Sequence, residues 1–217
     1  MKTITVKGVG KASVKPDLVV LSLSLETIGQ AYEFAMNNAA EKIDELNKSL
    51  AVVGLEKDSV KTTDFSVRTD YESKKDRNGN YYRKFNGYVV RHRLKVAFDF
   101  DSKMLAQTLS AIASCVSHPE ISINFTVKDA SAVNKALLAS AAENAKRKAE
   151  ILSAASGVKL GELISIDYNW GELDVYSHTR YDIEDECKCL MSVPTSMDIE
   201  PDNIDASDTV TFIWQLI

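Results

Sequence analysis

The stretch that decides the fold runs from residue 60 to residue 100 and reads VKTTDFSVRTDYESKKDRNGNYYRKFNGYVVRHRLKVAFDF. Its two ends, residues 60–71 and 81–100, have the alternation of two long strands, and Asn78-Gly79 between them is a strong hairpin signal. With Asn78 and Gly79 as the loop residues, the apolar side chains of both strands share one face, which a slip of one residue would destroy. The pairs expected on that face are Phe65 with His92, Val67 with Val90, and Thr69 with Tyr88; the other face pairs Asp64 with Arg93, and Ser66 with Arg91.

Further strands and three helices are predicted around this hairpin. Alternating apolar residues indicate strands over residues 3–9, 19–25, 121–127, 160–170 and 209–217. Apolar residues at steps of three or four indicate helices over residues 30–53 and 131–156, and a shorter helix that begins at Asp101 or Ser102. We therefore expect an α+β fold, with a mixed or antiparallel sheet, two long Ala-rich helices, one shorter helix and a long protruding hairpin.

The same patterns predict which side chains face the core. In the helices these are Leu105, Leu109, Ile112 and Val116, and then Val133, Leu137, Ala141, Ala145, Ala149 and Leu152. In the strand over residues 160–170 they are Ile164, Ile166, Tyr168 and Trp170.

The chain is interpreted as a single domain over residues 1–217. A hairpin extension is expected near residues 68–90, and a long acidic loop near residues 171–208, where no periodicity is visible. Loops of that length inside a compact domain are usually functional or mobile.

Composition narrows the class of protein. The 217 residues are 45% hydrophobic, which is enough to bury a core, and the net charge of -5 argues against general nucleic-acid binding. No apolar stretch is long enough to span a bilayer, and residues 1–8 do not resemble a secretory signal. The expected location is therefore cytoplasmic, where the three cysteines would be reduced.

Several motifs follow one another in a familiar order. They are Ile4-Thr5-Val6-Lys7-Gly8-Val9-Gly10 with Pro16-Asp17, Asp58-Ser59-Val60-Lys61-Thr62 with Phe65-Ser66-Val67, Gly87-Tyr88-Val89-Val90 with Leu94-Lys95-Val96, and the alanine-rich run from Ala136 to Gly161. Together they resemble the SIMPL-domain (DUF541) family over nearly the whole chain. The resemblance implies an α+β fold and self-association into ring-like or channel-like homo-oligomers. It implies no catalytic residue and no cofactor, and a role in stress protection has been suggested for some relatives.

This sequence departs from the family pattern at a few positions. Residues 1–8 do not resemble the export signal expected from many relatives, and His92 stands where relatives often have Asn. In Ile199-Glu200-Pro201-Asp202, which resembles a family turn, Asp202 replaces a glycine. The segment of residues 171–208 is also longer and more acidic than the resemblance implies.

A metal site is one interpretation of the late acidic segment. Cys187 and Cys189, with His178, would offer soft and borderline ligands for a metal- or redox-responsive binding module. The C-x-C spacing is a weak signal, because zinc sites usually carry C-x2-4-C with a second pair of ligands. A solvated acidic loop with incidental thiols is the alternative that we favour.

Catalytic motifs are missing from the sequence. There are three histidines, His92, His118 and His178, and no G-x-S-x-G, Walker or H-E-x-x-H pattern. Nucleophilic catalysis needs a nucleophile, a base and an orienting group together. We therefore predict a protein that is not an enzyme, and an unrecognised hydrolase stays as an alternative.

Charge is divided unevenly along the chain. Residues 61–95 hold 10 Lys/Arg and 4 Asp/Glu, a net +6, whereas residues 162–208 hold 2 Lys/Arg and 13 Asp/Glu, a net -11. These are either two solvated surfaces or complementary surfaces by which one copy of the chain binds the next. Nucleic-acid binding by the basic hairpin, with its aromatics stacked on bases, is a weaker alternative. The predicted homo-oligomer contacts are Tyr71, Arg77, Tyr81, Tyr82, Arg83, Phe85, Asp182, Glu184, Asp185 and Glu186.

Overall fold

A computed structural model describes residues 2–168, 175–183 and 199–217. The chain divides into two compact units, which are described separately. One comprises Met1–Asp17, Thr126–His178 and Pro201–Ile217, and the other Leu18–Phe125 and Thr179–Glu200. The described strands form a three-stranded sheet in the order β1-β8-β6 and a five-stranded sheet in the order β3-β4-β2-β5-β7. With three helices, they confirm the predicted α+β class. The interpretation as one domain stays a prediction.

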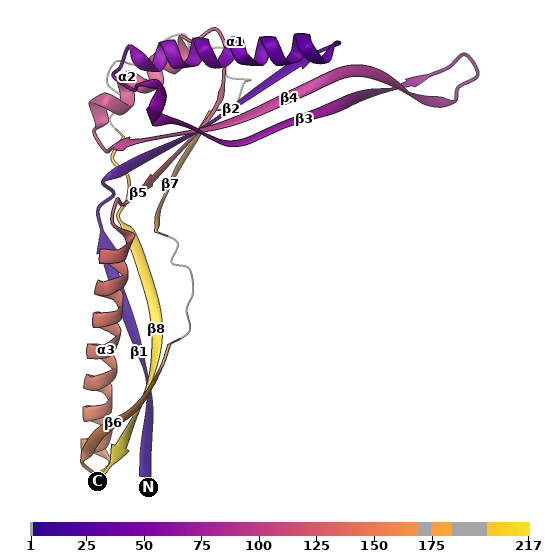
Figure 1. Cartoon of the computed structure of the whole chain (residues 1–217). Coiled ribbons are helices and arrows are strands. Elements are labelled where there is room, and N and C mark those ends of the chain that lie inside the picture. The colour runs from indigo at the N-terminus through magenta and orange to yellow at the C-terminus, as the bar shows by residue number, and fades with distance from the viewer. Residues whose placement is uncertain (1, 169–174, 184–198) are drawn as a thin grey trace. The chain divides into compact units, whose positions relative to one another are not determined.

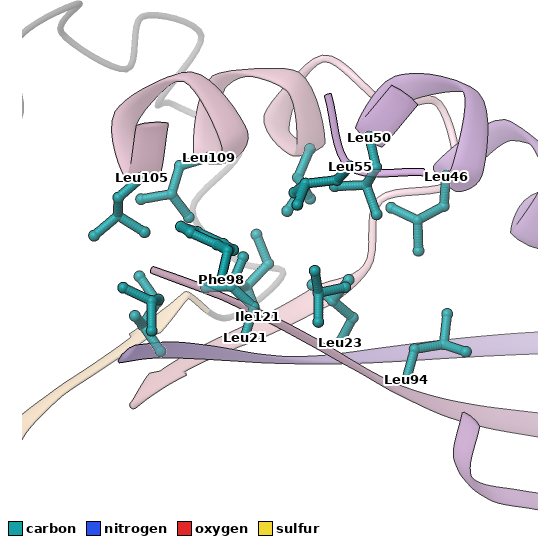
Figure 2. Close-up of a cluster of buried hydrophobic side chains, with 14 of the residues drawn as sticks. Leu21, Leu23, Leu46, Leu50, Leu55, Leu94, Phe98, Leu105, Leu109 and Ile121 are labelled. Carbon is teal, nitrogen blue, oxygen red and sulfur yellow. The ribbon is translucent and has the colours of Figure 1, made fainter. Parts of the chain in front are cut away.

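The larger unit is built on the five-stranded sheet, and α1 and α2 cover one of its faces (Figure 1). Its elements are β2 (Leu18–Gly29), α1 (Tyr32–Ala51), a short 3-10 helix (Lys57–Ser59), β3 (Val60–Lys75), β4 (Tyr81–Asp99), α2 (Ser102–Ala113), β5 (Glu120–Thr126) and β7 (Tyr176–Ile183). Leucines of both helices pack on alternate residues of the strands, as Figure 2 shows for Leu50, Leu105, Leu21 and Phe98. This alternation is the predicted one, and Val19, Leu21, Leu23 and Leu25 are all buried.

The predicted register of the hairpin is confirmed along its middle. Phe65 pairs with His92, Val67 with Val90 and Thr69 with Tyr88, and the opposite-face pairs are also those expected from the sequence. Because side chains alternate between the faces, this register follows from the apolar pattern alone.

The tip of the hairpin differs from the predicted two-residue loop. The main chain of Asp76 donates to the carbonyl oxygen of Asn80 at 2.9 Å, so residues 77–79 form a three-residue loop, with Gly79 at a φ of 86°. Three-residue hairpin loops place a left-handed residue last, which suits glycine. The extra loop residue is absorbed by a bulge in β4, where Asp70 pairs with Gly87 but Tyr71 pairs with Phe85.

The predicted helix ends are present, with one correction. The N–H of Leu55 donates to the carbonyl oxygen of Leu50 at 3.1 Å past Gly54, which closes α1 in the expected left-handed cap. The carboxylate of Asp101 accepts from the N–H of Met104 at 2.7 Å and caps α2. Val116, expected in the core, is exposed because α2 ends at Ala113 and the chain has already turned away.

The smaller unit packs one helix on the three-stranded sheet. Its elements are β1 (Lys2–Val14), α3 (Ala130–Ala155), β6 (Leu160–Asp167) and β8 (Ile204–Leu216), and α3 runs along β1 and β8 (Figure 1). Buried alanines of α3 lie against Val6, Val210, Phe212 and Trp214. The buried stripe advances by steps of four to Ser153, so Leu152, expected in the core, is half exposed.

Strand β6 departs furthest from its predicted burial. Ile164 and Ile166, expected to face the core, are 44% and 55% exposed. Tyr168 is partly buried as expected, and Trp170 lies outside the described residues. The physical reason is position: β6 is the edge of its sheet, and α3 lies over β1 and β8 instead.

Part of the expected acidic loop of residues 171–208 is strand. It contains β7, and β8 begins at Ile204 instead of residue 209. Strand β7 lies at the edge of the five-stranded sheet, where a strand needs no continuous apolar pattern, so its sequence YSHTRYDI gives little signal.

Candidate interaction surface

Strands β3 and β4 continue well beyond the rest of their sheet. The pairing of β2 with β4 ends at Gly29 and Tyr88, whereas β3 and β4 stay paired as far as Lys75 and Tyr81. We call residues 70–86 the hairpin overhang. In this segment each strand has only the other as a neighbour within the described sheet.

A row of aromatic rings leads from α1 onto the overhang. Ring centroids lie 5.6 Å apart for Tyr32 and Tyr88, 5.4 Å for Tyr88 and Phe85, and 5.7 Å for Phe85 and Tyr71. All three pairs are edge-to-face, a favourable geometry for aromatic side chains. The rings therefore form one continuous apolar strip.

The helix that covers this face does not reach the end of the strip. Tyr88 packs against the cluster of Val90, Ala35 and Ala39 under the start of α1. Beyond it, Tyr71 and Phe85 are each 43% exposed. The same face of the sheet is thus core at its base and surface on the overhang.

Cationic side chains lie on the aromatic rings of the overhang. The Arg83 guanidinium lies 4.8 Å from the ring centroid of Tyr71, and the Lys75 ammonium 4.8 Å from that of Tyr81. In such contacts the cationic group lies on the face of an aromatic ring and still remains in contact with water. The resulting surface suits a partner that offers apolar side chains together with carboxylates.

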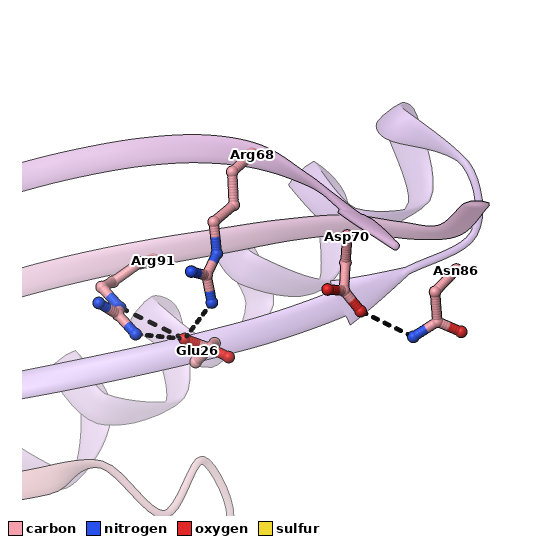
Figure 3. A network of polar contacts seen from close by, with 5 residues as sticks. All are labelled: Glu26, Arg68, Asp70, Asn86 and Arg91. Atoms are coloured by element: carbon pink, nitrogen blue, oxygen red, sulfur yellow. Dashed lines mark hydrogen bonds and ion pairs between the residues drawn. The ribbon is translucent and has the colours of Figure 1, made fainter. Parts of the chain in front are cut away.

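The other face of the hairpin carries a small polar network. The Glu26 carboxylate accepts from Arg91 at 2.8 Å and lies 3.8 Å from Arg68, and Asn86 donates to Asp70 at 2.8 Å (Figure 3). These side chains are partly exposed, and surface pairs of this kind contribute little to stability.

The turn of the overhang is held by one carboxylate. Asp76 accepts from the main-chain N–H groups of Asn78 and Asn80, both at 2.8 Å. The hydrogen bond from Asn80 is the main cause of a pKa for the Asp76 carboxyl below its ordinary value of 3.8. The tip is therefore locally ordered by side-chain-to-main-chain bonds.

The predicted contact residues separate into two groups. Tyr71, Arg77, Tyr81, Tyr82, Arg83 and Phe85 all lie in the overhang and are exposed. Asp182 lies in β7, whereas Glu184, Asp185, Glu186, Cys187 and Cys189 lie outside the described residues. His178 is exposed in β7, so the predicted metal ligands are not tested as a set. Tyr32 and Tyr88 extend the strip but are absent from the contact residues predicted from the sequence. Tyr88 could have been included, because the predicted hairpin pairing places it on the apolar face.

The histidine of the hairpin, His92, contacts a hydroxyl group and an aromatic ring of β3. His92 Nε2 lies 2.8 Å from the Thr62 hydroxyl, and its ring packs edge-to-face on Phe65 with centroids 5.1 Å apart. Burial lowers the pKa of His92 below its ordinary value of 6.5. Within the described ranges there is no group of three or more His, Cys, Asp or Glu residues placed to hold a metal ion.

The fold defines an α+β protein of two sheets, with an aromatic and basic hairpin as its most distinctive exposed feature. The chain belongs to the SIMPL family, described as "Protein of unknown function (DUF541)", whose model matches residues 4–214. This confirms the resemblance inferred from the sequence. No curated protein matches the chain. None of the described helices is long and apolar enough to cross a membrane.

Proposed function

We propose that this protein is not an enzyme and that it acts by binding further copies of itself through the hairpin overhang. The observation that supports this is the strip of Tyr71, Phe85 and Tyr88, which passes from beneath α1 onto an uncovered part of the same face. Large apolar strips left on a surface generally mark interaction sites.

The overhang alone provides only part of the required binding energy. Burying a half-exposed aromatic side chain contributes about 1 kcal/mol, so Tyr71, Tyr81, Tyr82 and Phe85 together contribute about 4 kcal/mol. A micromolar complex needs about 8 kcal/mol after the costs of association. Stable self-association therefore requires a second contribution from another surface of the neighbouring copy.

Charge supports a neighbour of the same kind. The net +6 over residues 61–95 and the net -11 over residues 162–208 are carried by one chain, so each copy offers both signs. Complementary charge mainly sets the orientation and the rate of association. A stress-related role, implied by the family resemblance, stays an expectation.

Size exclusion with light scattering tests the proposal. At tens of micromolar and low salt, the wild-type chain should have a mass above that of the 24.0 kDa monomer. The double variant Tyr81→Ser/Phe85→Ser should shift toward monomer. The matched control Phe34→Ser/Val52→Ser removes two exposed apolar side chains elsewhere and should keep the wild-type mass.

A wild-type chain that stays monomeric at both low and moderate salt would end the proposal. Equal masses for the hairpin variant and wild type would instead move the contact away from the overhang. Circular dichroism of each variant should show an unchanged fold, because the substituted side chains are at least 43% exposed.

A further inference from the structure

The two edges of the three-stranded sheet differ in whether side chains of α3 cover them. On the β1 edge, side chains of α3 form hydrogen bonds with main-chain groups that point away from the sheet. Asn144 Oδ1 accepts from the N–H of Val9 at 3.0 Å, and Ser140 Oγ accepts from the N–H of Lys11 at 3.2 Å. Lys148 Nζ donates to the carbonyl oxygen of Lys7 at 3.0 Å. Helix coverage of this kind prevents another strand from adding to an edge.

The opposite edge has no such cover among the described residues. Within the described sheet, strand β6 pairs only with β8, and Leu163, Ile164 and Ile166 on it are 46%, 44% and 55% exposed. Leu163 pairs with Trp214, and Ile166 pairs with Phe212. Both side chains therefore lie on the sheet face that α3 covers at the neighbouring strand β8. An apolar open edge of this kind is a template for an added strand.

Charge restricts what can be added there. Strand β6, residues 160–167, contains Glu162 and Asp167, both exposed, and no basic residue. Antiparallel pairing of β6 with β6 of another copy would bring these carboxylates toward each other, which is unfavourable. The added strand must therefore carry basic residues beside its apolar ones.

Among the described strands, one open segment combines basic and apolar residues with no acidic residue. In the overhang, no described strand lies on the side of β4 away from β3, because β2 ends opposite Tyr88. Its residues 81–86 read YYRKFN, with Arg83 and Lys84 and no acidic residue. The corresponding part of β3, residues 70–75, reads DYESKK, where two acidic residues balance two basic ones.

We propose that residues 81–86 of β4 in one copy add as a strand to the β6 edge, residues 160–167, of a second copy. The proposal rests on the self-association proposed above and names the surface that receives the hairpin. Main-chain hydrogen bonds would join the strands, and aromatic side chains would cover Leu163 and Ile166. Arg83 and Lys84 would lie between Glu162 and Asp167, which stand near the two ends of β6. Since the two surfaces differ, copies associate head to tail.

A charge exchange tests the pairing. Glu162→Lys/Asp167→Lys and Arg83→Glu/Lys84→Glu each create like charges across the contact, so each variant alone should lose association by about tenfold or more. Mixed in equal amounts, the two variants restore opposite charges at both contacts and should recover the wild-type mass. The matched control Glu143→Lys/Glu150→Lys makes the same charge change on the exposed side of α3 and should associate as wild type.

The outcomes separate the two proposals. A monomeric wild-type chain would overturn self-association itself. A wild-type oligomer that both exchanged variants form equally well, or whose loss is not reversed by mixing, would overturn the β4–β6 contact and leave self-association standing.

Hydrogen exchange on the wild-type chain gives a second measurement that needs no variant. Exchange in residues 81–86 and 160–167 should slow together as concentration rises, while the β1 edge, already covered by α3, should not change. Concentration-independent exchange in both segments of an associating sample would contradict the proposal.

Discussion

A side chain on Gly8 of β1 would place its Cβ atom 2.1 Å from the main-chain carbonyl oxygen of Ala141 on α3. The same Cβ atom would lie 2.7 Å from that of Ala145, and Gly10 stands in the same relation to the carbonyl oxygen of Leu137. Helix and strand therefore approach more closely than ordinary side chains allow. This approach brings Asn144 within hydrogen-bonding distance of the β1 edge.

Gly8→Ala should destabilise the protein strongly. The group it would strike is main chain, which cannot move aside as a flexible side chain can, so we expect a loss of about 3 kcal/mol, the upper part of the usual range for overpacking. Urea unfolding would measure it. Thr5→Ala, an exposed position on the same strand, is the control and should lose less than about 1 kcal/mol. Equal losses would contradict the close packing.

Asn144→Ala should open the protected edge of β1. The N–H of half-buried Val9 loses its acceptor, which should lower the free energy of unfolding by about 1 kcal/mol. Exchange of the Val9 amide should also become faster. Glu143→Ala, one residue away on the exposed side of α3, should change neither quantity. An unchanged Val9 amide in Asn144→Ala would show that the bond does not protect the edge.

His92 should make stability fall as the solution is acidified. Burial lowers its folded-state pKa below the ordinary value of 6.5, so below about that pH the unfolded chain binds more protons than the folded one. Stability from this source is complete above pH 6.5 and is lost as pH falls toward the folded-state pKa. His92→Asn should therefore flatten the fall of Tm between about pH 7.5 and about pH 5, a range that includes the ordinary histidine pKa.

The exposed His178 provides the comparison for this pH profile. His178→Asn should follow the wild-type Tm at every pH. A His92→Asn profile parallel to that of wild type would assign the acid sensitivity to other groups.

Glu26→Gln should have little effect on stability despite its two arginine neighbours. The carboxylate and both guanidinium groups are more than a third exposed, and pairs of that kind contribute about 0–1 kcal/mol. Urea unfolding should therefore give a loss within that range, and less at high salt. Glu45→Gln on the exposed side of α1 is the control. A loss well above about 1 kcal/mol, toward the roughly 3–5 kcal/mol that breaking a buried pair costs, would contradict this.

Much of the fold could be predicted because its signals are local. The alternation in Val19, Leu21, Leu23 and Leu25, the cap at Gly54 and the pairing of Val67 with Val90 all follow from spacing along a short stretch of chain. The predicted loop of the hairpin is one residue too short. The sequence does not show the bulge at Asn86 and Gly87, which compensates for the extra loop residue.

The candidate surface was only partly visible in the sequence. The charges and aromatics of residues 71–85 could be read directly, but not the point at which α1 stops covering their face. The open edge of β6 was missed because Ile164 and Ile166 alternate as core residues do. Alternation shows that side chains share a face, and it does not show whether anything covers that face.

By itself, the sequence determined all the element types except strand β7, together with the hairpin register and the family, since each depends on residues close together or on an ordered set of motifs. Only the tertiary structure decided which edge of the small sheet is closed. That closure joins Val9 to Asn144, 135 positions apart, and it depends on two glycines that admit a helix against a strand. Contacts across such separations leave no periodic trace in the chain, because they are fixed by packing rather than by local spacing.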